Sequence, residues 1–166
     1  MYRGSSLLLQ KDYRVHKDAI REIFNDKYNP LWGISCKDLV LNNNLDLVFE
    51  LSDKLKAIYI EKRKNLDNYD DVSSILITKI LMGTLGCVPA YDRFFINTIK
   101  EYKIASSIFN MQSLHDIAML YNDNREKLQI FKDKVENSQG IKYPEMKLLD
   151  MFFWYISFES DGKSID

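Results

Sequence analysis

Four charged residues stand in segments of the sequence that are otherwise apolar, and they are the first candidates for chemistry. Lys79, Asp92 and Arg93 lie within residues 75–95, which read ILITKILMGTLGCVPAYDRFF, and Asp150 lies in an apolar segment near the C-terminus. A lysine whose pKa is lowered by burial can act as a nucleophile, and a nearby aspartate can stabilise positive charge or activate water. Lys79 and Asp92 are therefore the candidate catalytic residues, and Arg93 and Asp150 complete a predicted buried polar network.

A structural role is the alternative explanation for these four charges. Because burying an unpaired charge is costly, such groups are expected to pair with one another or to extend to the surface. Asp92 would favour the positive dipole end in the first turn of its helix, and Arg93 would form a buried ion pair with Asp150. We favour the structural role, since ion pairs within a fold produce the same pattern as an active site.

The segment from Thr78 to Phe95 resembles, locally, the helix-hairpin-helix DNA glycosylase-like proteins, in which a glycine-bearing hairpin precedes a segment that ends in an aspartate. Gly86 and Ala90 stand for the G-x-x-x-A of the hairpin, Lys79 for the catalytic lysine and Asp92 for the aspartate. In that family the lysine lies within the hairpin, whereas Lys79 precedes the glycines here. The resemblance implies a nucleic-acid enzyme that uses Lys79 and Asp92.

A second group of residues could bind phosphate, because a few basic side chains suffice for salt-dependent binding to a nucleic acid. These candidates surround Tyr59 in one predicted helix and are Lys54, Lys56, Lys62, Arg63 and Lys64. The alternative is an ordinary solvated helix face, and we favour it for two reasons. Asp53 and Glu61 interrupt the basic residues, and the whole chain carries 23 basic against 24 acidic side chains.

The common catalytic and metal-binding motifs do not occur in the sequence. It contains no GxxxxGK[ST] phosphate loop, no GxGxxG, no HExxH zinc helix and no GxSxG elbow. His16 and His115 lie far apart, and His115 has no second histidine at the HxxxH spacing. We therefore expect no metal and no cofactor.

The cellular location is predicted from the cysteines and from the apolar runs. Cys36 and Cys87 do not form a disulfide framework or a CxxC pair, so reduced thiols in the cytoplasm are expected. The N-terminal run Leu7-Leu8-Leu9 is too short for the apolar core of a signal peptide. No apolar run approaches the roughly 20 residues that span a bilayer, so we expect no membrane insertion.

The periodicity of apolar residues predicts the elements that position these groups. Regular β alternation is not sustained anywhere, and we expect an all-α protein, an irregular bundle of about six helices. Residues 1–158 should form one domain, and residues 159–166 should be a frayed tail. The final helix, which Pro144 opens, is apolar on every face, so we expect it to be central and wrapped by the others. The other expected helices span about 11–25, 44–64 and 72–85, one that begins at Pro89, and one that begins with a Ser113–Asp116 capping box and continues toward Val135.

Two functional hypotheses follow from the sequence, and whether the protein is an enzyme stays open. The first is a small intracellular helical protein that binds another protein, or a second copy of itself, without catalysis. The aromatic run Phe152-Phe153-Trp154-Tyr155 fits a core, and part of it could form that interface. The second is a nucleic-acid-binding protein or a DNA glycosylase-like enzyme that uses Lys79 and Asp92.

Overall fold

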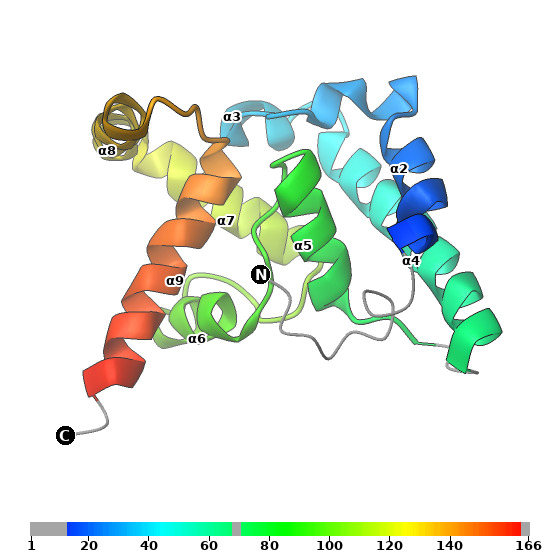
Figure 1. Ribbon diagram of the computed structural model, residues 1–166. Helices are drawn as coiled ribbons and strands as arrows, with labels where there is room; N and C mark the ends of the chain where they lie inside the picture. The colour runs from blue at the N-terminus through cyan, green and yellow to red at the C-terminus, as the bar shows by residue number, and fades with distance from the viewer. Residues whose placement is uncertain (1–12, 68–70, 164–166) are drawn as a thin grey trace.

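The computed structural model describes residues 13–67 and 71–163, and these residues form helices joined by loops, without a β-strand (Figure 1). Six of the described helices have nine residues or more, which agrees with the expected all-α bundle of about six helices. Four shorter helices complete the described part. The elements are η1 (Tyr13–His16), α2 (Lys17–Ile23), η2 (Asp26–Leu31), α3 (Cys36–Leu39), α4 (Asn44–Asp67), α5 (Ser74–Thr84), α6 (Arg93–Glu101), α7 (Met111–Asp123), α8 (Arg125–Gln139) and α9 (Glu145–Lys163).

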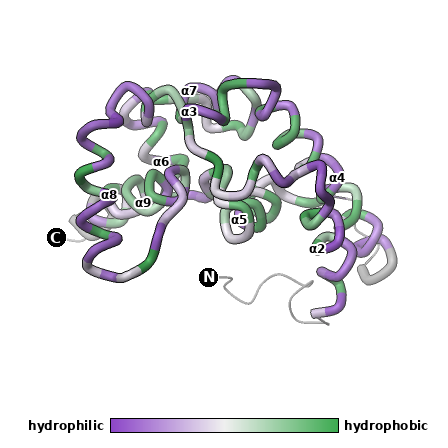
Figure 2. The backbone as a smooth tube through the Cα atoms, turned by 90° about the horizontal axis from the view of Figure 1, so that it is seen from above, coloured by the Kyte–Doolittle hydropathy of each residue, from purple (hydrophilic) through white to green (hydrophobic). Residues whose placement is uncertain are grey.

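The N-terminal helices pack as amphipathic helices should. α2 lies along α4 and buries Ala19 and Ile23 (Figure 1). α4 buries Val48, Leu51 and Leu55, which recur at steps of three and four residues. Hydrophilic and hydrophobic residues alternate along both helices, as Figure 2 shows in purple and green. This part of the fold follows directly from the apolar pattern of the sequence.

Three helix starts differ from the expected positions, because a nearby side chain caps the helix better. α5 begins at Ser74 rather than at residue 72, because Ser73 caps it by accepting the Leu76 N–H with its hydroxyl. α6 begins at Arg93 instead of Pro89. α7 begins at Met111 with Asn110 as its cap, and Ser113 donates its N–H to that cap. The continuous helix expected toward Val135 is two helices that meet at Asn124.

The C-terminal helix α9 is not wrapped on every face, and this corrects the prediction of a central helix. It packs mainly against α6, where the Thr98 hydroxyl donates to the Phe153 carbonyl at 2.8 Å. Met146, Leu149 and Phe153 are buried on this side, while Trp154 and other apolar residues opposite them are exposed. α9 also continues to Lys163, past residue 159 where the frayed tail was expected to begin. No helix in the described ranges is both long and apolar enough to span a membrane.

A close backbone contact holds the start of α9 in place. Gly86 has φ +68°, and Cγ and Cβ of Pro144 occupy the position where a side chain on Gly86 would begin. Only glycine combines this left-handed conformation with the absence of a Cβ. The loop between α5 and α6 therefore packs closely against Pro144, the residue that precedes α9.

Candidate functional site

The structure brings together three of the four charges found in the apolar segments. The Lys79 Nζ, on α5, lies 3.2 Å from the Asp92 Oδ2, which precedes α6. The Asp92 Oδ1 also caps α6 by accepting the Phe95 N–H at 3.3 Å. Both side chains of the ion pair are partly exposed, at 25% for Lys79 and 21% for Asp92. Both carboxylate oxygens of Asp92 thus have structural partners.

Asp150 joins this cluster from α9 by way of the loop between α5 and α6. Its Oδ1 accepts the Ala90 N–H at 2.8 Å. The pKa of Asp150 is raised to about 6, mainly by burial and also by the nearby Asp92, while the Ala90 N–H, Lys147 and Lys79 act in the opposite direction. The carboxylate of Asp150 therefore ties α9 to the loop that precedes α6.

Arg93 does not belong to the buried network, and this expectation was wrong. Its side chain lies on the exposed side of α6, with the guanidinium carbon 4.6 Å from the centre of the Phe94 ring. Arg93 is the first residue of the helix after the Asp92 cap, and it is exposed whereas Phe95 is buried. The buried partner of Asp150 is the backbone of Ala90 instead.

Four of the five candidate phosphate-binding residues on α4 contact acceptors within the chain. Lys54 pairs with Glu22 at 3.0 Å and with Glu50 at 3.5 Å. Lys62 pairs with Asp18 at 2.6 Å. The remaining contacts join Lys56 to the Asp71 carboxylate at 3.9 Å and Arg63 to the Asp71 carbonyl at 2.9 Å, and Lys64 is exposed. The charge of this helix is largely balanced by its own neighbours.

An ion pair with a buried carboxylate, which the sequence analysis missed, lies at the start of α9. The Glu145 carboxylate is 9% exposed and accepts from Arg125 of α8 at 2.9 Å and from the Cys36 N–H at 2.7 Å. Arg125 also donates to Asn122 at 2.8 Å, and Asn122 donates to the Cys36 carbonyl at 3.2 Å. Burial raises the pKa of the Cys36 thiol far above its ordinary value, and Glu145 adds to that effect.

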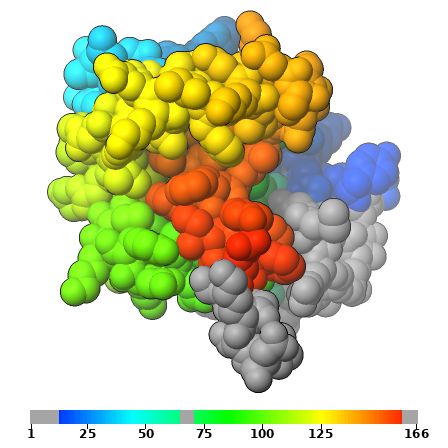
Figure 3. Space-filling model, turned by 90° about the vertical axis from the view of Figure 1, so that its left-hand side faces the viewer, coloured from blue at the N-terminus to red at the C-terminus, as the bar shows by residue number. Residues whose placement is uncertain are grey.

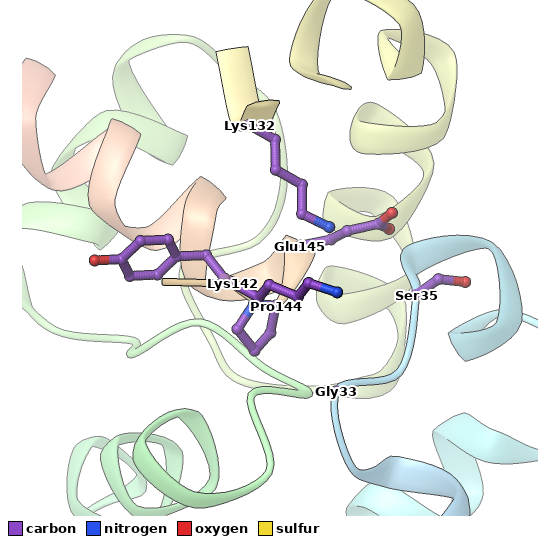
Figure 4. Close-up of a pocket in the computed structure, with 7 residues that line it drawn as sticks. Gly33, Ser35, Lys132, Lys142, Pro144 and Glu145 are labelled. Atoms are coloured by element: carbon purple, nitrogen blue, oxygen red, sulfur yellow. The ribbon is translucent and has the colours of Figure 1, made fainter. Parts of the chain in front are cut away.

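This ion pair borders an open pocket of about 300 Å³. Lys132 and Lys142 extend into it, with Glu145 and Ser35 beyond their amines (Figure 4). Lys132 is also 3.8 Å from Glu136 on its own helix. In the sequence, Glu145 is an acidic residue directly after Pro144. That pattern is typical of any helix start, so it did not indicate the ion pair with Arg125. The pocket itself depends on contacts between distant segments.

Aromatic and apolar side chains form an exposed surface on the outer side of α9. Trp154 and Phe158 are stacked, with ring centres 4.9 Å apart, and Phe94 of α6 meets both rings edge-on. On the other side of α9, Phe152 contacts Phe131 of α8. We name this surface the aromatic face; its residues are Phe94, Phe131, Met151, Phe152, Trp154, Tyr155 and Phe158.

The aromatic face is exposed although its residues are apolar. Trp154 is 40% exposed, Tyr155 55% and Phe158 53%. Figure 3 shows the C-terminal half of α9, in orange to red, open at the surface between α8 above and α6 beside it. The run from Phe152 to Tyr155 therefore divides, because Phe153 is in the core and its neighbours are at the surface.

Known proteins do not identify the site, since no protein family, curated protein or solved structure matches the chain. Within the part of the chain that the structure describes, no group of three or more His, Cys, Asp or Glu side chains could hold a metal ion. The resemblance of Thr78 to Phe95 to DNA glycosylase-like proteins stays a prediction. The function is therefore inferred from the geometry of the described residues.

Proposed function

We propose that this protein acts by binding another protein through the aromatic face of α9, without catalysis. The observation that carries the proposal is the exposed ring cluster of Phe94, Trp154 and Phe158. Contiguous apolar surface is costly to leave in water, and large patches of it mark binding sites. Tryptophan, tyrosine and arginine are also the residues that most often dominate binding energy at protein interfaces.

The arrangement of α9 supports this role because the helix has two apolar stripes. One stripe, with Met146, Leu149 and Phe153, packs into the core. The second repeats at helical spacing as Met151, Trp154, Tyr155 and Phe158 and faces solvent. The core stripe and the bond from Thr98 to Phe153 hold the outer stripe on a fixed support. A rigid support lowers the entropic cost of ordering side chains on binding.

The catalytic and nucleic-acid alternatives have less support. Asp92 caps α6 with one oxygen and holds Lys79 with the other, which is a complete structural role. The basic side chains of α4 mostly contact acceptors in the chain itself. We also propose that the protein acts in the cytoplasm, because a reducing compartment suits the buried free thiols of Cys36 and Cys87.

The test is site-specific photo-crosslinking in the cells that make the protein. A photoreactive phenylalanine analogue would replace Tyr155 in one variant and Phe24, which is 67% exposed on another surface, in the control. The proposal expects a crosslinked protein adduct of defined mass, including a possible dimer of the chain, from position 155 and none from position 24. Equal, weak and diffuse products from both positions would contradict it.

A further inference from the structure

We infer that the open pocket beside the start of α9 is a binding site for a phosphate group, which the amines of Lys132 and Lys142 hold. The ligand is a small phosphate monoester or the free phosphate ion. This site is separate from the proposed protein-binding surface, because none of the residues that line the pocket belongs to the aromatic face. The inference therefore does not rest on the proposed function.

Three segments that are distant in the sequence form the pocket. The segment before α3 supplies Gly33 and Ser35, α8 supplies Lys132, and the loop into α9 supplies residues 142–145. Lys132 and Lys142 extend into the same space from two different elements (Figure 4). Two positive charges in one pocket repel each other, so an anion that lies between them is stabilised by both.

The carboxylates at this pocket already have donors within the chain. Glu145 accepts from Arg125 at 2.9 Å and from the Cys36 N–H at 2.7 Å. Glu136, which precedes the pocket on α8, accepts the Tyr143 N–H at 2.9 Å. These bonds balance the two negative charges before either lysine is considered. The acidic residues therefore do not account for the two lysine amines.

The lysine amines are the donors that the fold leaves available. Lys132 has a side chain that is only 20% exposed, yet its nearest carboxylate, that of Glu136, is 3.8 Å away. Lys142 is exposed and forms no ion pair with any residue in the described part of the chain. The Ser35 hydroxyl is not available in the same way, because it donates to Asp38 at 2.7 Å. A ligand would thus be held mainly by the two amines.

Two further features of this region favour a bound anion. α9 has 19 residues and begins at Glu145, which lines the pocket, so the positive end of its dipole lies here. Tyr121 is fully buried beside Arg125, and its hydroxyl has no hydrogen-bond partner among the described residues. Tyr121 does not line the pocket itself. The polar cluster at the start of α9 nevertheless retains an unsatisfied buried donor.

Charge and volume indicate the class of ligand. A phosphate monoester carries a charge of about −1.5 to −2 near pH 7, which matches two ammonium groups. Lysine commonly binds phosphate as a point charge. The pocket volume of about 300 Å³ is at the lower end for small-molecule sites. A bare phosphate ion would fill only part of this space, and Tyr143 and Pro144 line room for an organic group.

The first experiment is an NMR titration of the full chain, labelled with ¹⁵N, at constant ionic strength. The probes are inorganic phosphate and ribose 5-phosphate, with ribose as the uncharged control. We expect both phosphates to cause saturable shifts in the millimolar range or below, centred on the amides of Gly33, Cys36 and Tyr143. Tighter binding of the ester would assign the site to a phosphorylated small molecule, and equal binding would assign it to free phosphate. Shifts that do not saturate, or that ribose also causes, would overturn the inference.

A pair of charge-matched variants tests the role of the two lysines. Lys132→Met/Lys142→Met removes both amines from the pocket. Lys127→Met/Lys134→Met is the control, because it removes the same charge from exposed positions of α8. We expect the dissociation constant for phosphate to rise at least about tenfold in the pocket variant and to stay within about twofold in the control. Equal losses in both variants would show a general effect of charge and would overturn the inference.

Lys142→Met alone keeps the test decisive if the double variant does not fold. Lys142 lies in an exposed loop without an ion pair in the described chain, so its loss should leave the fold intact. We expect binding of phosphate to weaken about threefold or more. A folded Lys142→Met chain that binds phosphate as tightly as the wild type would overturn the inference. Crosslinking at position 155 is unaffected by this result, so the proposed function is judged separately.

Discussion

The outer surfaces of α4 and α9 differ in how many of their side chains have partners within the chain. On α4, Lys54 and Lys62 form ion pairs with carboxylates of α2, and these pairs balance the positive charge of the surface. On α9, Trp154 and Phe158 stack on one another and meet Phe94 edge-on, and both remain substantially exposed. A charged helix can be neutralised by single side chains, whereas a broad apolar stripe needs a second surface.

That difference teaches that the amount of charge or apolar area in a helix does not by itself indicate a binding surface. The basic residues of α4 are the more conspicuous group in the sequence, yet they have partners within the fold. The aromatic residues of α9 look like core in the sequence, yet four of the five are exposed to solvent. A side chain has a structural role where a neighbouring element of the same chain pairs with it or covers it. Where no neighbouring element does so, the side chain is available for binding.

The largest effect should come from breaking the support of α9 at its first residues. Gly86→Ala would place a methyl group against the Pro144 ring and would strain a φ of +68°. We expect the free energy of unfolding to fall by roughly 3–5 kcal/mol, from overpacking and left-handed strain together. Urea denaturation measures it, with Gly83→Ala as the control, because a Cβ at Gly83 meets no atom within 4 Å. Equal stability of the two variants would mean that Pro144 is not fixed by this contact.

A somewhat smaller loss should follow the removal of the positive partner of Glu145. Arg125→Met retains the aliphatic stem but leaves a carboxylate that is 9% exposed without its 2.9 Å partner. Breaking such a pair costs about 3 kcal/mol, because the remaining charge stays desolvated. The double variant Arg125→Met/Glu145→Gln should recover part of the stability, and a double-mutant cycle measures this. No recovery would show that Arg125 acts through packing on Tyr121 instead.

The stability of the Asp150 contact should depend on pH in a defined direction. Because the pKa of Asp150 is raised to about 6 from an ordinary value near 4, the folded state binds more protons between these values than the unfolded state does. Stability should therefore fall as pH rises from about 4 to 6 and stay level above that. In Asp150→Asn, which retains an acceptor for the Ala90 N–H, this fall should disappear, and we expect about 1–2 kcal/mol more stability at pH 7.5.

Thermal denaturation of both chains from pH 4 to pH 8 tests this prediction. A stability of the wild type that rises between pH 4 and 6, relative to Asp150→Asn, would mean that the folded state favours the charged carboxylate.

The smallest effect should come from the surface of α4. Lys62→Gln removes the ion pair with Asp18, whose pKa is lowered mainly by the hydrogen bond and charge of Lys62. Because this pair is at the surface and screened by solvent, we expect a change in stability close to the error of the measurement. A fluorescent oligonucleotide titrated at low salt should bind neither chain measurably. Binding that weakens with salt and is lost in Lys62→Gln would revive the nucleic-acid hypothesis.

The sequence predicts the fold class well and the surface role of α9 poorly, for a physical reason. The stripe of Val48, Leu51 and Leu55 has one apolar side, so its packing follows from helical spacing alone. α9 is apolar on all sides, and that pattern is the same for a helix covered by its own chain and for one covered by a partner. The predicted starts of α5 and α7 differ by a few residues from the observed ones, where Ser73 and Asn110 are the caps. Several polar residues near each helix start could serve as the cap, and the sequence does not show which one does.

The candidate site shows the same limit. The Lys79–Asp92 pair spans 13 positions in one segment, so local sequence could suggest it. The contact of Cys36 with Glu145 spans 109 positions and depends on how α3, α8 and α9 meet. Pairings of that range require the folded structure.

The most direct test of the account is the fluorescence of Trp154 in the Trp32→Phe chain, which leaves one tryptophan as reporter. Acrylamide quenching would be measured on the purified chain alone and after addition of the protein that is crosslinked at position 155. The account predicts that quenching decreases and that the emission shifts to shorter wavelength as the aromatic face is covered. Quenching that is the same with and without that protein, at the level of a 40% exposed indole, would contradict it.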